Sequence, residues 1–257
     1  MNSKISARGL TKVFEDTGVK ALDGVDFDVA DGEFVCLLGP SGCGKTTLLE
    51  LLAGLTAATS GEAVLTRRGR APACMVFQDL ALFPWLNVEE NVGAGLRFQG
   101  VPAPERKRRA SGMLDRFRIA DAARLYPHQL SGGMAQRAAL ARAFVCEPEI
   151  LLMDEPLGRL DASTRRLLQE EFIALWEADR KTVVFVTHSI EEALLLADRV
   201  LVMTARPGRI KASMPVPFAR PRGPATCRAP GFFEAEQSLW SLLEGETRRT
   251  LDDKEPA

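Results

Sequence analysis

The sequence predicts an α/β fold in which helices cover both faces of a parallel sheet. Five short apolar runs support this prediction, because strands buried on both faces are apolar along most of their length. Stretches with helical periodicity separate the runs, as expected where parallel strands need crossover connections. The runs are Phe34 to Leu38, Cys74 to Phe77, Ile150 to Met153, Thr182 to Thr187 and Val200 to Met203.

The segment before the first run has a different pattern. Apolar and polar residues alternate from Val25 to Ala30, as they do in a strand with one buried face. Asp31 and Gly32 follow directly and form a turn signal that leads into the next strand. We therefore expect an N-terminal antiparallel β subdomain in addition to the parallel core.

Helices are predicted between the runs. The pattern from Lys45 to Ala53 ends at Gly54, a residue that favours the left-handed conformation after a helix. A second pattern, from Ala162 to Asp179, places its large apolar residues on one face. Residues from about 85 to 145 are mainly helical and interrupt the strand series, so we predict an inserted helical lobe there.

The end of the chain departs from this alternation. Strand character is lost after about Ile210, and four prolines between positions 215 and 224 disfavour a helix. A short amphipathic helix is expected from Phe232 to Leu243. We therefore predict one domain over residues 1–212, with the helical lobe inserted at about 85–145. A C-terminal extension over residues 213–257 follows, proline-rich at first and then a short helix.

The composition is that of a soluble globular protein. The 257 residues carry a net charge of −1, with 46% hydrophobic and 26% charged residues. A general nucleic-acid binder would show a basic excess, so nucleic acid is not an expected partner. The basic run Arg106 to Arg109 follows Glu105 in a predicted surface helix, and we interpret it as a solvated face.

Cysteine usage and hydropathy indicate the compartment. The five cysteines are scattered and form no CxxC pair, which favours reduced thiols in a cytosolic setting. The N-terminal residues lack the apolar core of a signal peptide. No stretch approaches the roughly 18 apolar residues that a membrane-spanning helix requires. Any membrane role would therefore come from a partner chain.

A glycine-rich loop between the first apolar run and the next helix fits the pattern GxxxxGK[ST]. Its glycines let backbone N–H groups approach phosphate, and the helix N-terminus adds a favourable dipole. Lys45 is expected to reach the β- and γ-phosphates, and the Thr46 hydroxyl is expected to ligate Mg²⁺, which prefers oxygen ligands. The alternative is a strand–helix turn without a ligand. The residues predicted to bind the nucleotide here are Gly39, Pro40, Ser41, Gly42, Cys43, Gly44, Lys45, Thr46 and Thr47.

An acidic pair follows the third apolar run. The strand end would deliver Asp154 toward the metal, where a carboxylate can hold Mg²⁺ directly or through water. Glu155 would then lie where a water attacks the γ-phosphate, and such a general base contributes about 10²–10⁴ in rate. The alternative is a solvated acidic pair that caps a helix, because Pro156 fits a helix start or a turn.

Polar residues also follow two other runs. His188 comes after the run ending at Thr187, and in α/β sheets the carboxyl ends of strands face the ligand crevice. There it would contact the γ-phosphate and hold Glu155 and the attacking water in place. The amide of Gln78 would meet Mg²⁺ or the attacking water, although its spacing alone is a weak signal. His128 is interpreted as structural.

A second glycine-rich segment runs from Leu130 to Arg137 and contains Gly132 and Gly133. We interpret it as a second anion-binding element. The first loop already accounts for the phosphates of one nucleotide. Two such elements on one chain suggest that each completes a site on another copy of the chain.

Together these motifs resemble the ATP-binding-cassette (ABC) ATPases, in the order of that family and over about residues 5 to 212. The resemblance implies a P-loop NTPase (RecA-like) core with ATP and Mg²⁺ as ligands. Phe14 matches the aromatic residue that stacks on adenine, and Leu130 to Arg137 match the signature motif, with Met134 in place of its glutamine. The other matches are Gln78 in the Q loop, Asp154 and Glu155 in the second Walker motif, Leu160 and Asp161 in the D loop, and His188 as the switch histidine.

The resemblance also implies that two cassettes pair head to tail as a homodimer. Ser131 and Gly133 of one cassette would then bind the γ-phosphate that Lys45 of the other holds. It implies catalytic roles for Glu155 and His188. Beyond the phosphate loop, it implies nucleotide contacts by Phe14, Gln78, Ser131, Gly132 and Gly133, and metal ligation by Thr46, Gln78 and Asp154.

Smaller features resemble the nitrate/sulfonate/taurine importer branch of the family. They are the segments Phe77 to Val88, Glu90 to Val92 and Thr204 to Ile210. Glu155 to Asp161 and Thr187 to Ser189 are similar to the taurine importers in particular. The resemblance implies a peripheral motor subunit on the cytoplasmic face of the cell inner membrane. Its partners would be two integral-membrane permease subunits and a periplasmic or extracellular solute-binding protein.

Taurine is the expected solute, with aliphatic sulfonates, nitrate and pyrimidines as alternatives. Leu82, Phe83 and Trp85 would form the groove that receives a permease helix, with core packing as the alternative. A soluble non-transport ABC protein is a competing class, but such proteins usually carry a long coiled coil, zinc modules or a second cassette. An unrelated P-loop kinase is disfavoured by the signature motif.

Overall fold

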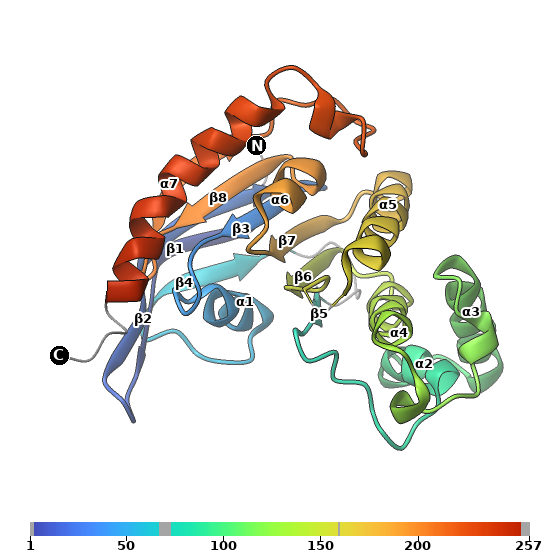
Figure 1. The fold of residues 1–257 in the computed structure, drawn as a ribbon. Coiled ribbons are helices and arrows are strands. Elements are labelled where there is room, and N and C mark those ends of the chain that lie inside the picture. Colours follow the sequence, from blue (N-terminus) through green and yellow to red (C-terminus); the bar gives the residue numbers. More distant parts are fainter. Residues whose placement is uncertain (1–2, 67–72, 159, 253–257) are drawn as a thin grey trace. The chain divides into compact units, whose positions relative to one another are not determined.

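The computed structural model describes residues 3–66, 73–158 and 160–252 (Figure 1). These residues fall into two compact units. The first unit is formed by Met1–Arg68 and Arg180–Ala257, and the second by Gly69–Asp179.

The first unit contains an antiparallel sheet with the strand order β2-β1-β4. The strands are β1 (Ser3–Phe14), β2 (Val19–Ala30) and β4 (Ser60–Leu65). In β2 the alternating apolar residues Val25, Phe27 and Val29 are buried, as their periodicity predicts. The antiparallel N-terminal subdomain is thus present.

The same unit holds a second sheet with the order β7-β3-β8-β9. Its strands are β3 (Phe34–Leu38), β7 (Thr182–Val186), β8 (Arg199–Met203) and β9 (Ile210–Pro215). β3 pairs in parallel with β7 and β8, and β9 is antiparallel to β8. Every residue of β3 and β7 is buried, which explains their uninterrupted apolar runs.

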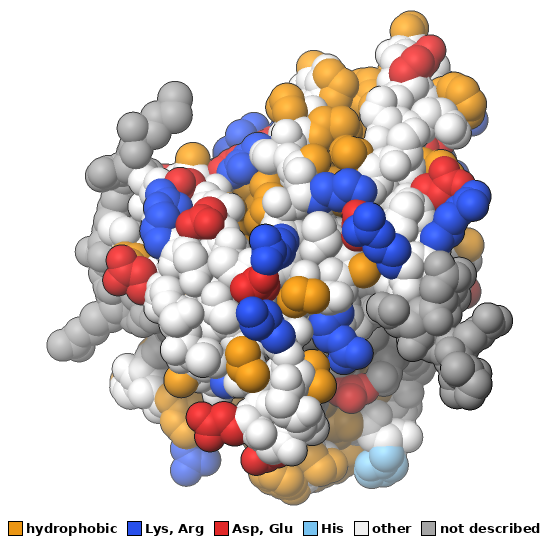
Figure 2. Space-filling view, turned by 90° about the vertical axis from the view of Figure 1, so that its left-hand side faces the viewer, with side chains coloured by type: hydrophobic (Ala, Val, Ile, Leu, Met, Phe, Trp, Pro, Cys, Tyr) orange, Lys and Arg blue, Asp and Glu red, His pale blue; other side chains and the backbone are white. Residues whose placement is uncertain are grey.

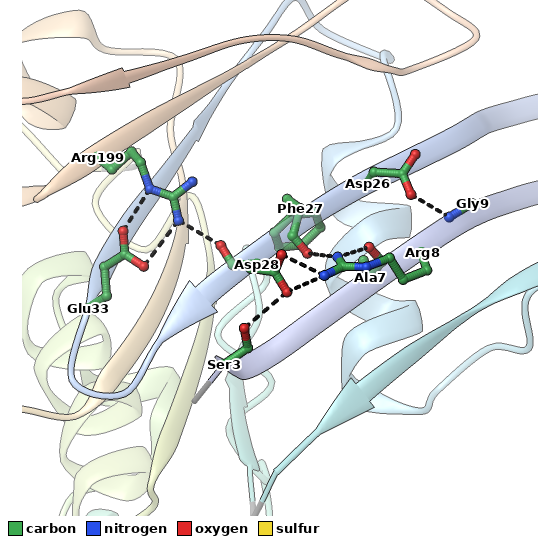
Figure 3. Close-up of polar contacts among 9 residues, drawn as sticks. All are labelled: Ser3, Ala7, Arg8, Gly9, Asp26, Phe27, Asp28, Glu33 and Arg199. Atoms are coloured by element: carbon green, nitrogen blue, oxygen red, sulfur yellow. Dashed lines mark hydrogen bonds and ion pairs between the residues drawn. The ribbon is translucent and has the colours of Figure 1, made fainter. Parts of the chain in front are cut away.

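Arg199 connects the two sheets of the first unit (Figure 3). Its guanidinium binds the Glu33 carboxylate at 2.7 Å and the backbone carbonyl of Asp28 at 2.6 Å. The Asp28 carboxylate in turn receives two hydrogen bonds from Arg8, at 2.6 and 2.7 Å, and one from Ser3 at 3.1 Å. One residue of β2 therefore ties β1 and β8 together through its side chain and its carbonyl.

Three α-helices complete the first unit: α1 (Lys45–Ala53), α6 (Ile190–Leu196) and α7 (Phe232–Asp252). A short 3-10 helix, η3 (Thr226–Arg228), precedes α7. α7 lies beside β8 and α6 (Figure 1). On the face drawn in Figure 2, Lys and Arg side chains are interspersed with Asp and Glu side chains, in keeping with the net charge of −1.

The second unit contains two parallel strands, β5 (Ala73–Val76) and β6 (Ile150–Asp154), and four α-helices. Ring contacts between Phe117, Phe144 and Phe172, at centroid distances of 5.7 and 5.8 Å, lie in its core. The helices are α2 (Val88–Phe98), α3 (Ala103–Arg116), α4 (Gly132–Phe144) and α5 (Ala162–Ala178), with short 3-10 helices η1 (Ala120–Ala122) and η2 (Pro127–Gln129). Helices thus occupy much of the segment 85–145.

Two sequence-based expectations near the end of the chain are wrong. Strand character does not end at Ile210, because β9 continues to Pro215 as an edge strand whose residues alternate between half-buried and exposed. The final helix is not short, because α7 extends 21 residues from Phe232 to Asp252. The half-exposed edge strand lacks the apolar run used to find the others, and this explains why it was missed.

The turn at Asp31 and Gly32 also differs from a simple hairpin. β2 pairs with β1, while β3 joins the parallel sheet, so the turn moves the chain from one sheet to the other. Among the described residues, no helix is both long enough and apolar enough to cross a membrane.

Candidate functional site

The phosphate loop is the segment between β3 and α1 in the first unit, and its glycines have specific steric roles. Gly44 adopts a φ of 101°, and a Cβ there would lie 2.8 Å from the Ala21 carbonyl oxygen. A side chain at this position is therefore excluded both by backbone strain and by the neighbouring strand. The loop is closed by a hydrogen bond from the Cys43 N–H to the Pro40 carbonyl at 3.4 Å.

The first side chains of α1 belong to two of the residues predicted to bind the nucleotide. Lys45 is 7% exposed, and its ammonium donates to the carbonyls of Gly39 at 2.8 Å and Pro40 at 2.9 Å. Thr46 is exposed in the first turn. No side chain caps α1, so its first N–H groups remain directed toward the loop. Burial raises the pKa of the Cys43 thiol, which agrees with a structural role for that residue.

Gly208 supports the phosphate loop from the turn between β8 and β9. A Cβ on Gly208 would lie 2.1 Å from the carbonyl oxygen of Cys43. Its N–H donates to the Ala21 carbonyl at 2.9 Å, and its carbonyl accepts from the Asp23 N–H at 3.1 Å. Only glycine allows this approach, so the segment Thr204 to Ile210 braces the loop.

Two further predicted ligands of ATP lie in the first unit. Phe14 is the last residue of β1, and its ring is partly exposed with the Lys12 ammonium 5.2 Å from its centroid. His188 is exposed in the loop between β7 and α6. Ser189, the next residue, caps α6 through a 3.2 Å bond from the Glu192 N–H, and this fixes the backbone beside His188.

The acidic pair lies in the second unit at the carboxyl end of β6. Asp154 is 3% exposed and ends the strand. Glu155 adopts a φ of 43°, which is rare for a residue other than glycine. The amide nitrogen of Gln78 donates to a carboxylate oxygen of Glu155 at 3.2 Å. The structure therefore joins two residues that are 77 positions apart in sequence.

The strained backbone at Glu155 supports the functional interpretation of this pair. A left-handed glutamate costs on the order of 1–3 kcal/mol and persists where the surroundings hold it in place. The carbonyl of Pro156 accepts a hydrogen bond from the buried Gln136 amide, and the Glu155 carbonyl accepts from Gly158 at 3.1 Å. The chain after β6 is held on both sides of Pro156, so the Glu155 carboxylate has a defined direction.

The second glycine-rich segment forms the N-terminus of α4. Ser131 is the N-cap, and its hydroxyl accepts from the Met134 N–H at 3.3 Å. Ser131 and Gly132 are exposed, and Gly133 is half-buried. A Cβ added at Gly133 would lie 3.1 Å from the methyl group of Thr164, so a larger side chain there would be crowded. The first turn of α4 carries no charged side chain. It offers a hydroxyl and N–H groups but no cation of its own.

The D-loop aspartate caps the next helix. Asp161 is the N-cap of α5 and accepts from Ser163 N–H at 3.1 Å and Thr164 N–H at 3.0 Å. Hydrogen bonds from Ser163 and Thr164 hold the pKa of Asp161 far below its usual value. Arg159, part of the motif that resembles taurine importers, lies outside the described residues.

An apolar groove of about 390 Å³ lies on the second unit. Trp85 is 71% exposed and rests on Phe83 with ring centroids 5.5 Å apart. Leu82 is partly exposed but does not line the groove. The groove is lined by Phe83, Trp85, Leu86, Glu89, Glu90, Gly93, Ala94, Arg97, Phe98, Ala103, Arg106 and Lys107.

Two residues that organise this region were not predicted from the sequence. Asn91 is fully buried and bonds to the N–H and carbonyl of Phe83, at 2.7 and 3.1 Å, and to the Leu86 carbonyl at 2.9 Å. Arg142 donates to the carbonyls of Leu80 and Ala81 and lies over the Phe83 ring. The available signal was a polar residue among the apolar residues of one helix face.

The predicted site residues are thus distributed over both units. The first holds Phe14, His188 and the phosphate loop, and the second brings Gln78 and Glu155 together and exposes Ser131 on α4. The donor set fits Mg²⁺, because a hydroxyl, an amide oxygen and a buried carboxylate are hard oxygen ligands. Those donors are Thr46, Gln78 and Asp154.

Comparison with known proteins identifies the family. The family model of ABC transporters matches residues 22–158. An uncharacterized ABC transporter ATP-binding protein of Methanocaldococcus jannaschii is 43% identical over 98% of this chain and 95% of that protein. The taurine import ATP-binding protein TauB of Roseobacter denitrificans is 47% identical over 78% of this chain and 76% of that protein.

A solved structure agrees with the sequence relatives. It is a dimeric ATP-binding cassette in a post-hydrolysis state, bound to ADP and Pi. The two chains are 32% identical, and their structures match with a TM-score of 0.75. The match covers 84% of this chain and 100% of the solved cassette. The predicted P-loop NTPase fold is therefore confirmed. The chain belongs to the ABC transporter family, and it is an ATPase whose hydrolysis of ATP is coupled to transport.

Proposed function

We propose that this chain is the motor subunit of an importer for a small organic anion, with taurine as the leading candidate. The relative from Roseobacter denitrificans, a taurine import protein, supports this choice. The Phe83–Trp85 groove and the Thr204 to Ile210 turn are the segments that resemble the same branch. Aliphatic sulfonates, nitrate and pyrimidines remain the alternatives, because the permease and binding protein select the solute.

The observation that carries the proposal is the presence of two helix N-termini suited to anions on one chain. The N-terminus of α1 has Lys45 beside it, while that of α4 offers the Ser131 hydroxyl and N–H groups without a cation. Helix N-termini bind phosphate through N–H groups and the helix dipole. In the proposed homodimer, Ser131 and Gly133 of one copy bind the γ-phosphate held by Lys45 of the other.

The chemical roles follow from the local geometry. Glu155 accepts the proton of the attacking water, and its bond to Gln78 couples the base to the Q loop. His188 contacts the γ-phosphate, and Phe14 stacks on adenine. Thr46, Gln78 and Asp154 would hold Mg²⁺, which would neutralise negative charge on the phosphates when bound. ATP thereby becomes part of the interface, and hydrolysis removes the γ-phosphate contact that favours the closed dimer.

Coupling to membrane subunits is assigned to the groove on the second unit. Exposed aromatic side chains at a groove are typical anchors for a partner helix. We place the chain at the cytoplasmic face of the inner membrane, bound to two permease subunits that receive solute from a binding protein. The internal bonds of Asn91 to Phe83 and Leu86 hold the aromatic segment in shape for this contact.

The first test is the Glu155→Gln variant. Removal of the general base leaves the phosphate contacts intact, so ATP binding should persist while hydrolysis falls by about 10²–10⁴. The variant should also accumulate as an ATP-bound dimer, measured by size exclusion with nucleotide counting. Asp79→Asn, an exposed acid beside the same loop, is the matched control and should retain wild-type turnover. Normal turnover by Glu155→Gln would refute the assignment of the base.

The solute is tested separately. Deletion of the gene should abolish growth on taurine as sole sulfur source at low concentration, while growth on sulfate continues. Calorimetry of the partner binding protein should show taurine binding above aliphatic sulfonates. The deletion strain could instead grow normally on taurine and lose growth on another anion. That anion would then be the transported solute.

A further inference from the structure

The hydrogen bond between Gln78 and Glu155 is placed by the register of two parallel strands. Val76 of β5 pairs with Met153 of β6, and Gln78 and Glu155 each lie two residues further along the chain. The register brings the two side chains to the same edge of the sheet, where the Gln78 amide donates to the Glu155 carboxylate at 3.2 Å. Both residues lie beyond the ends of their strands, so the strand ladder does not fix their backbone.

The turn after Glu155 is held by a side chain of α4. Gln136 is buried, and its amide nitrogen donates to the carbonyl of Pro156, which is also buried. A buried carbonyl that loses a donor is costly, so this bond resists opening. Glu155 itself has a φ of 43°, a conformation that persists only where the surroundings hold it. Gln136 therefore acts on the backbone directly after the proposed base.

A second side chain of the same helix holds the loop after Gln78. The Arg142 guanidinium donates to the carbonyls of Leu80 at 2.7 Å and Ala81 at 2.6 Å. These carbonyls lie two and three residues beyond Gln78. α4 thus contacts the backbone just after each partner of the Gln78–Glu155 bond, although the two partners are 77 positions apart in sequence.

The direction of the Glu155 carboxylate is what these contacts can control. A general base must lie within hydrogen-bond reach of the water that it deprotonates, and a misplacement of about 1 Å can reduce the rate by about 100-fold. The bond from the Gly158 N–H to the Glu155 carbonyl at 3.1 Å lies within the turn and moves with it. Gln136, in contrast, ties the turn to a separate helix.

We propose that Gln136 and Arg142 are positioning residues for ATP hydrolysis, through which α4 holds Glu155 and Gln78 in the geometry that the general base requires. Gln136 acts through the carbonyl of Pro156, and Arg142 acts through the carbonyls that follow Gln78. Neither side chain contacts the nucleotide in this scheme. The catalytic effect rests on the proposed role of Glu155 as the base.

The test compares steady-state ATP turnover of full-length variants. Gln136→Met removes the amide donor with little change in volume, and kcat should fall by about 10- to 100-fold because the base is misplaced. The KM for ATP should stay within about twofold of wild type, since the phosphate loop is unchanged. Gln136→His keeps a nitrogen donor at a similar reach and should retain most of the wild-type kcat.

Gln169→Met is the matched control. Gln169 is also a buried glutamine of the second unit, but it lies on α5. Its replacement should leave kcat unchanged, whatever its effect on thermal unfolding. Equal losses of kcat in Gln169→Met and Gln136→Met would overturn the proposal, because removal of any buried amide from this unit would then have the same effect.

A Glu155→Gln background separates positioning from a general structural role. With the base already absent, Gln136→Met should cause no further loss of the residual hydrolysis, measured in a single turnover with radiolabelled ATP. A merely structural role would reduce hydrolysis by the same factor in both backgrounds. That result would overturn the proposal, because Gln136 would then act independently of Glu155.

Arg142→Met keeps the proposal testable if thermal unfolding shows that Gln136→Met does not fold. Arg142 is only half-buried, so its loss should lower kcat by a smaller factor, again without effect in the Glu155→Gln background. Wild-type kcat in Gln136→Met and Arg142→Met, with an impaired Glu155→Gln, would overturn the positioning role alone. Wild-type turnover in Glu155→Gln would instead refute the base itself, so the two failures are distinguishable.

Discussion

The N-termini of α1 and α4 begin with similar glycine-rich sequences but are built differently. At α1 no side chain caps the helix, Lys45 is folded against the loop carbonyls, and Gly208 braces the loop from behind. At α4 the Ser131 hydroxyl caps the helix, the first turn has no cation, and the end is exposed. The first is built as a phosphate cradle, whereas the second, in the proposed homodimer, is half of a site that a lysine of the other copy completes.

The difference extends to the units that carry these helices. In the first unit the predicted functional residues all concern one nucleotide. The second unit presents the exposed N-terminus of α4, which the Ser131 hydroxyl caps, and the Trp85 groove, both of which are suited to other chains. We infer that the first unit cradles the nucleotide, whereas the second supplies the base and metal ligands and also carries the surfaces for association with other chains.

The largest expected effect comes from mixing variants that damage opposite helix ends. In a Glu155→Gln background, which is expected to trap ATP-bound dimers, Lys45→Ala removes the cation and Gly133→Asp places a negative charge at α4. Neither chain alone should form the dimer, and each should lose at least about 100-fold in ATP affinity. Mixed together, the two chains should form a heterodimer that retains one ATP, counted by chromatography of the isolated dimer.

The control for this experiment separates charge from packing. Gly133→Ala introduces only a Cβ, which would lie 3.1 Å from the Thr164 methyl group, and it should disturb the dimer much less than Gly133→Asp. If mixing yields no nucleotide-bound heterodimer although both chains are folded, α4 does not complete the nucleotide site of the other copy.

The second prediction concerns the brace behind the phosphate loop. Gly208→Ala would force a Cβ to within 2.1 Å of the Cys43 carbonyl. Such overpacking costs typically 1–3 kcal/mol, so the free energy of unfolding and the affinity for ATP should both decrease. Denaturant unfolding and nucleotide titration measure the two effects.

Gly245→Ala is the matched control for this substitution. It lies in α7 of the same unit, with no heavy atom within 4 Å of the added Cβ, and alanine is favoured by about 1 kcal/mol over glycine in a helix. It should leave ATP affinity unchanged. Wild-type affinity in Gly208→Ala would show that the loop does not depend on the β8–β9 turn.

The role of Gly208 illustrates what could not be predicted from local pattern. The phosphate loop, the acidic pair and the five central strands are local signals, and the structure contains all of them. The steric demand on Gly208 comes from Cys43, and the bond from Gln78 to Glu155 spans 77 positions. Contacts of this kind depend on tertiary packing, and no window of sequence contains both partners.

Two missed elements have similar physical explanations. β9 alternates between half-buried and exposed residues at a sheet edge, so it has no apolar run, and Pro215 at its end suggested irregular structure. Asn91 and Arg142 lie on helices, but the carbonyls that they bind belong to a loop. The helical pattern of each segment therefore gives no sign of these bonds. Polar residues on buried helix faces are therefore the signal to examine in such sequences.

The smallest effect on the isolated protein is expected from Trp85→Ala. Trp85 is 71% exposed and contacts the Phe83 ring at its edge of the groove, so its removal opens no core cavity. Basal ATP turnover and thermal stability should remain within error of wild type. Association with detergent-solubilised permease should weaken by about 30-fold, as expected when an aromatic anchor worth about 2 kcal/mol is lost.

Trp240→Ala provides the control, since Trp240 is also an exposed tryptophan, at 49%, but lies on α7 in the first unit. If the division between units is correct, this variant should bind the permease normally. Equal losses of turnover and permease binding in Trp85→Ala would mean that Trp85 serves packing within the second unit. Equal losses of permease binding in both tryptophan variants would mean that the permease contacts the first unit as well as the second. Association with the membrane partner would then not be a property of the second unit alone.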